Sequence, residues 1–149
     1  MFPKKMIPML MTLLLLLSFS AGAEQIPVSM KGKIITNQND IDIPASNLVK
    51  KLNSQDRKVI ARSEGRWTVH LVAFFNKPLP TERMGIVVLD SKQEPVAVAQ
   101  VGGAKGQKTL ATHIDIDSTE SPGTKHVIRV YYAKSGKAIT LAEKNIVLK

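Results

Sequence analysis

The chain has 149 residues, of which 21 are lysine or arginine and 12 are aspartate or glutamate, and its formal net charge is +9. This length predicts one domain, large enough to bury a hydrophobic core. The absence of cysteine excludes a disulfide framework, a lipid attached to cysteine and a catalytic thiol.

Residues 1–23 have the pattern of a secretory signal peptide. Lys4 and Lys5 precede an apolar run that ends in Ala21-Gly22-Ala23, the small residues that favour cleavage. A membrane anchor is the alternative, because the uncharged run reaches the lower length limit for spanning a bilayer. Pro8 and the lack of a basic stop-transfer cluster favour the signal peptide. We therefore expect export to the periplasm or the extracellular space.

Cleavage after Ala23 would leave one β-sandwich domain, residues 24–149, with a net charge of +7. Its first part, residues 24–65, is expected to contain an N-terminal strand and a short helix. The pattern predicts a strand over 26–36, a turn-rich segment over 37–44, a helix over 45–53 and a short strand over 57–63. In the helix, Leu48, Val49 and Leu52 share one side.

Residues 66–149 are expected to form the main sandwich. The first predicted strand, 66–76, has a wholly apolar face that includes Trp67, whereas its other face mixes Thr68 and His70 with apolar residues. This pattern is typical of a central strand. The remaining strands are predicted at 84–90, 95–101, 108–117, 124–134 and 137–149.

About seven short strands separated by turns predict an all-β fold. Within residues 108–137, Pro122-Gly123-Thr124 is followed by an alternating strand from Val127 to Tyr132. This run resembles the last strands of fibronectin type III and other immunoglobulin-like domains, although His126 stands where that family has tyrosine. The resemblance implies a single immunoglobulin-like, fibronectin type III-like antiparallel β-sandwich, and it implies no particular activity.

The glycine-rich stretch 101–109, VGGAKGQKT, has the composition of a nucleotide-binding loop but not its spacing. Gln107 separates Gly106 from Lys108, and a strand is predicted where such a loop needs a helix. We therefore predict no nucleotide and no other cofactor. The stretch is expected to be a flexible connection with glycines at positive φ, and Lys105 and Lys108 would let it contact an acidic partner.

His113, Asp115 and Asp117 alternate along one predicted strand and should face solvent together. Imidazole and carboxylate groups suit several transition metals, which makes these three the weak candidates for a metal site. Residues two apart on a strand stand about 6.6–7 Å apart, so one ion would need a ligand from a neighbouring strand. His70 is the only other histidine expected to face solvent similarly. We predict no metal site and solvated polar residues instead.

No serine lies in a Gly-x-Ser-x-Gly turn, and no other catalytic constellation is present, so the protein is predicted not to be an enzyme. Arg57, Lys58, Arg62 and Arg66 belong to the densest basic stretch and are candidates for binding a partner.

We expect a non-catalytic binding module in the cell envelope or extracellular space, whose partner is another envelope or secreted protein. The partner would dock at a sheet edge or on two end loops, 77–83 and 102–106. Two alternatives stay open. The basic protein could adhere to anionic envelope polymers, or it could be a small metal- or ligand-binding enzyme that uses His113, Asp115 and Asp117.

Overall fold

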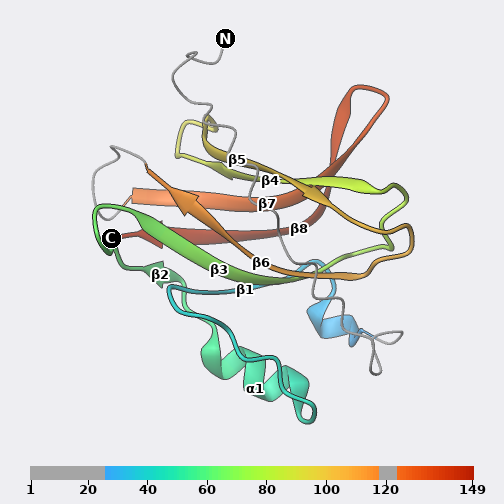
Figure 1. Ribbon diagram of the computed structural model, residues 1–149, viewed down its shortest axis with the longest axis horizontal. Coiled ribbons are helices and arrows are strands. Elements are labelled where there is room, and N and C mark those ends of the chain that lie inside the picture. Colours follow the sequence, from blue (N-terminus) through green and yellow to red (C-terminus); the bar gives the residue numbers. More distant parts are fainter. Residues whose placement is uncertain (1–25, 118–123) are drawn as a thin grey trace.

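The computed structural model describes residues 26–117 and 124–149, and most of these residues belong to β-strands (Figure 1). The predicted signal peptide and Pro122-Gly123 lie outside the described residues. The elements, in chain order, are a 3-10 helix Val28–Met30, β1 Ile34–Asn37, α1 Leu48–Gln55, β2 Val59–Ile60, β3 Trp67–Phe74, β4 Arg83–Leu89, β5 Pro95–Gly102, β6 Thr109–Ile116, β7 Thr124–Lys134 and β8 Lys137–Leu148.

The strands form two sheets, which confirms the predicted all-β class. One sheet has the order β1-β3-β6, and the other, which is curled, has the order β2-β8-β7-β4-β5. All neighbours are antiparallel except β2 and β8, which are parallel. The prediction of a purely antiparallel fold was wrong for this pair, because β2 enters the second sheet at its edge, running in the direction of the C-terminal strand.

The predicted strand over 26–36 is shorter in the structure. Its first half is a 3-10 helix after Pro27, followed by a turn in which Gly32 has a φ of 79°. Hydrogen bonds from Met30 N to Pro27 O and from Lys33 N to Met30 O close these turns. The strand β1 therefore begins only at Ile34.

The main core lies between the two sheets. As predicted, β3 is a central strand, and one of its faces carries Trp67, Val69, Leu71 and Ala73, each at most 1% exposed. These side chains belong to one buried cluster with residues of the second sheet such as Ile86.

A second, smaller core covers part of the opposite face of β3. Val72 and Phe74 pack there with Met30, Ile35 and Leu52, and Leu48 and Val49 lie against them. This confirms the predicted apolar side of the helix, which lies outside the pair of sheets, beside β1 (Figure 1). The helix begins at Leu48, after Asn47 with a φ of 53°. Thr68 and His70 lie at the polar end of the same sheet face.

A polar cluster joins β8 to the first sheet. Lys144 Nζ donates a hydrogen bond to Thr36 Oγ1 at 2.7 Å and forms an ion pair with Asp56. Asp56 Oδ1 also accepts a hydrogen bond from Thr36 N at 3.0 Å. Burial lowers the pKa of Lys144 from 10.5, outweighing Asp56, which raises it.

This burial predicts that the protein becomes more stable in alkaline solution. Between the lowered pKa of Lys144 and 10.5, the folded chain binds fewer protons than the unfolded chain, so the free energy of unfolding should rise as the pH rises through that window. The variant Lys144→Met should show a smaller rise in urea denaturation series recorded from neutral pH upward. The control is Lys125→Met, because Lys125 is exposed. If the free energy of unfolding of Lys144→Met rose with pH as steeply as that of the unchanged protein, this explanation would be contradicted.

Candidate functional site

The two end loops expected to contact a partner lie side by side, at the right-hand end of the molecule in Figure 1. Leu79 N donates to Gln107 O, and Gly106 N donates to Leu79 O, each at 2.8 Å. A third bond of 2.8 Å runs from Gly103 N to Glu82 O. The β3–β4 and β5–β6 connections therefore form one continuous surface.

Leu79 anchors this surface to the core. Its side chain is 1% exposed, whereas Pro78 and Pro80 on either side of it are exposed. Each proline fixes its own φ and favours an extended residue before it. The segment thus presents Lys77 outward while Leu79 points inward.

Gly103 permits the close approach of the two loops. A Cβ atom at this position would lie 2.6 Å from Met84 Cε and 2.7 Å from Leu79 Cδ2, and both of these side chains are buried. At the neighbouring Gly102, an added Cβ would meet nothing within 4 Å.

We therefore expect Gly103→Val to destabilise the protein by about 1–3 kcal/mol, the usual cost of overpacking. Gly102→Val is the matched control and should change the free energy of unfolding by about 0.5 kcal/mol or less. Urea denaturation of both variants gives the comparison. Equal stability of the two would show that Leu79 and Met84 move aside without cost.

Two adjoining grooves cross this end of the molecule. The larger, with a volume of about 590 Å³, is lined by Ile26, Pro27, Val28, Lys31, Phe75, Asn76, Lys77, Pro78 and Lys108. The smaller, of about 410 Å³, is lined by Lys77, Pro78, Pro80, Thr81, Tyr132, Ala133 and Lys134. Among the described residues, four lysines and no carboxylate line the two grooves. We call this surface the lysine groove.

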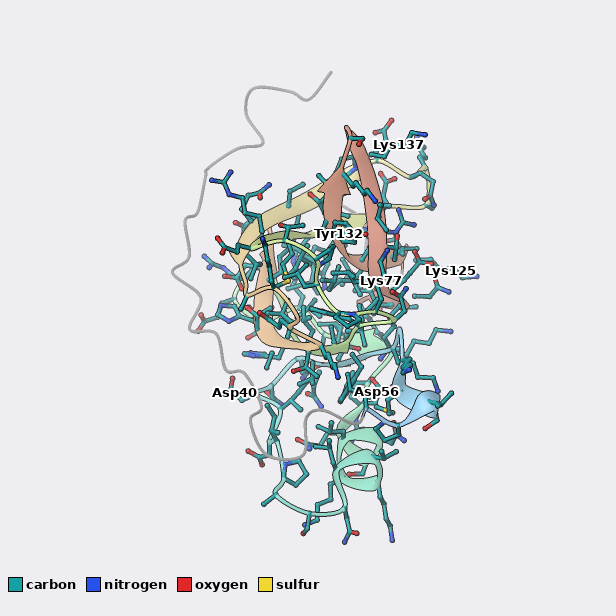
Figure 2. The ribbon with its side chains drawn as sticks, turned by 90° about the vertical axis from the view of Figure 1, so that its right-hand side faces the viewer. Asp40, Asp56, Lys77, Lys125, Tyr132 and Lys137 are labelled. Carbon is teal, nitrogen blue, oxygen red and sulfur yellow. The ribbon has the colours of Figure 1, made fainter. Side chains whose placement is uncertain are left out.

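Lys77 stands where the two grooves meet. Its Nζ lies 5.0 Å from the centre of the Tyr132 ring, a cation–π contact that holds the ammonium group over the wall of the smaller groove. Figure 2 views this end and shows the two side chains close together, below the β7–β8 hairpin that carries Lys137. The hairpin extends past β4, whose pairing with β7 stops at Gly85 and Tyr131.

The lysine groove offers both charged and apolar contacts. Its ammonium groups can hold anions, and its proline, tyrosine and valine side chains offer apolar contact.

The glycine-rich stretch is a hydrogen-bonded turn rather than the flexible connection expected from its composition. As predicted, a strand follows it, and Gly106 has a positive φ of 88°. The prediction of positive φ was wrong for Gly102 and Gly103. The amides of Gly103, Gly106 and Gln107 all donate to backbone carbonyls, so they are not available to wrap a phosphate. Lys105 is exposed on this turn, and Lys108 lies in the lysine groove.

Most of the predicted basic stretch has partners within the chain. The Arg62 guanidinium lies 4.6 Å from the centre of the Trp67 ring, and Arg57 donates to the carbonyls of Ser54 and Asp56. Arg66 forms ion pairs with two aspartates of the predicted metal candidates. Lys58 is exposed. None of these four lines the lysine groove.

The metal candidates His113 and Asp115 lie on the outer face of the first sheet, and Asp117 follows the end of β6. Arg66 lies 3.9 Å from Asp115 and 3.7 Å from Asp117. Asp115 also accepts a hydrogen bond of 2.7 Å from Thr68. Within residues 26–117 and 124–149, no three His, Asp or Glu side chains converge as metal ligands.

Strand pairing brings His70 directly opposite His113. The centres of the two imidazole rings are 5.4 Å apart, and His70 Nδ1 lies 3.1 Å from Asp40 Oδ1. Burial lowers the pKa of His70 from 6.5, although the carboxylate of Asp40 raises it. The sequence predicted that both histidines face solvent. It did not predict that they lie opposite each other, because that depends on the order of the strands in the sheet.

His126, predicted to be a structural residue, is 1% exposed on the inner face of β7. Its Nδ1 lies 3.2 Å from the carbonyl of Thr124 on the same strand.

The sequence did not identify Lys31, Lys134 or Tyr132 as site residues. They come from separate segments, and only the folded chain brings them beside Lys77, which lies in a predicted end loop.

Comparison with protein-family models finds no match to this chain, and no curated protein is significantly similar to it. In the part of the chain that the structure describes, no helix is both long enough and apolar enough to cross a membrane.

Proposed function

We propose that this protein is an exported, non-catalytic binding module of the immunoglobulin-like or fibronectin type III-like class, and that its lysine groove binds an anionic polymer chain of the cell envelope. The observation that carries this proposal is the convergence of Lys31, Lys77 and Lys134 on two adjoining grooves that no described carboxylate lines. The grooves share Lys77 and Pro78, so one extended ligand can contact both.

A binding assay with a defined polymer tests the proposal. The purified protein should bind immobilised polygalacturonate but not neutral dextran. The affinity should fall as salt rises, because salt screens the attraction between lysines and carboxylates. Equal binding to both polymers, or an affinity that salt does not change, would contradict the proposal.

A second candidate function is the binding of another envelope or secreted protein by strand addition at β5. This strand is the last in its sheet, and its sequence PVAVAQVG carries no charge. Val98 is 54% exposed there. An uncharged edge strand can pair with a strand from another protein. Crosslinking at high salt should then capture a protein partner, and Val98→Lys should abolish the capture, whereas capture that persists in this variant would contradict it.

A further inference from the structure

We propose that His70 and His113 form a binding site for one divalent transition-metal ion of the zinc, nickel or copper type, on the part of the outer face of the first sheet that α1 leaves uncovered. The site differs from the metal candidates of the sequence, because it uses one histidine from each of two paired strands. It is also separate from the lysine groove, and it does not depend on the proposed function.

The distance between the rings fits a shared ion. Zinc–nitrogen bonds are about 2.0–2.1 Å long, so the centre of a ligating imidazole lies about 3.2 Å from the ion. Two such rings at a tetrahedral angle have their centres about 5.2 Å apart. The observed separation is 5.4 Å. The backbone therefore already places the two rings at nearly the spacing that one ion requires.

Asp40 supports His70 as a ligand. Its Oδ1 lies 3.1 Å from Nδ1 of His70, which leaves Nε2 for the metal. A carboxylate on the other ring nitrogen is the usual arrangement around metal-binding histidines, because it fixes the tautomer and makes the ligating nitrogen more basic.

Among the described residues, the two histidines are the protein ligands of the proposed site. Asp115 lies on the same face, but Thr68 and Arg66 bind its carboxylate. Arg66 also pairs with Asp117. Water would therefore complete the coordination, and two imidazole ligands favour late first-row ions over calcium or magnesium.

Titration with Zn²⁺ tests the site, using purified protein without a polyhistidine tag. We expect one ion per chain. In NMR spectra at neutral pH, the ring signals of His70 and His113 should shift, while those of the buried His126 should not. Either His70→Asn or His113→Asn should weaken binding at least about 10-fold, and Asp40→Asn should weaken it about 10-fold, as the loss of a supporting carboxylate typically does.

Asp117→Asn is the matched control, because it removes a nearby carboxylate that is not part of the site, and it should leave the affinity unchanged. Circular dichroism would verify that each variant is folded. Zn²⁺ binding that persists in the double variant His70→Asn/His113→Asn would overturn the proposal. Unshifted signals of both rings in excess Zn²⁺ would do the same.

Discussion

The double variant Lys31→Glu/Lys77→Glu should bind an anionic polymer at least about 10-fold more weakly than the unchanged protein. Lys77 lines both parts of the lysine groove, and Lys31 lines the larger one. Each exposed ion pair contributes about 0.2–1 kcal/mol, and each reversal replaces an attraction with a repulsion. Four such contributions sum to about 0.8–4 kcal/mol, and the middle of this range exceeds the 1.4 kcal/mol that corresponds to a 10-fold change in affinity. Titration calorimetry with polygalacturonate at constant salt measures the difference.

The control is Lys50→Glu/Lys51→Glu, which changes the net charge equally. Both lysines are exposed on α1, which lies outside the pair of sheets, and neither lines the grooves. This control should lose less affinity than Lys31→Glu/Lys77→Glu, because neither side chain lines the grooves and exposed charges that do not contact the ligand are partly screened by salt. If both double variants lost affinity equally, the net charge of the chain would control binding, and the lysine groove would have no special role.

Trp67→Ala should lower the free energy of unfolding by about 3–5 kcal/mol, the usual loss when a buried tryptophan is removed. Trp67 is completely buried, and its Nε1–H donates a hydrogen bond of 3.2 Å to the carbonyl of Lys149. Small domains have a total stability of about 5–15 kcal/mol, so this variant would lose a large part of it.

Because Trp67 is the only tryptophan of the chain, the variant has to be measured by far-UV circular dichroism rather than by tryptophan fluorescence. Arg62→Ala is the matched control. It removes the guanidinium that stacks on the ring and leaves the ring in place, so it should cost only about 0.5–1 kcal/mol. Equal losses in the two variants would mean that the stacking, rather than the burial of the ring, stabilises this part of the fold.

The features predicted well from the sequence are those in which local pattern and burial agree. The alternation from Trp67 to Phe74 indicated a central strand, and the spacing of Leu48, Val49 and Leu52 indicated the buried side of α1. In both the strand and the helix, the apolar side chains that recur at the period of the element are the ones that pack in a core.

Other features depend on partners far away in the sequence. The parallel pairing of β2 with β8 joins Val59 to Val147, and nothing near Val59 specifies it. The lysine groove combines Lys31, Lys77 and Lys134 from three separate segments, and of these lysines only Lys77 lay in a predicted end loop. The prediction of a strand from residue 26 was wrong for a local reason. Pro27 and the positive φ at Gly32 favour turns over the first half of that segment.

The bonds between the two end loops have a consequence for how this surface can change. Backbone atoms alone connect Leu79 with Gly106 and Gln107, and Gly103 with Glu82. Exposed side chains beside these bonds, such as Lys77 and Lys105, can therefore be exchanged while the backbone hydrogen bonds persist. The end of the sandwich can serve as a template for new specificities, selected from libraries at these exposed positions with Leu79 and Gly103 kept constant.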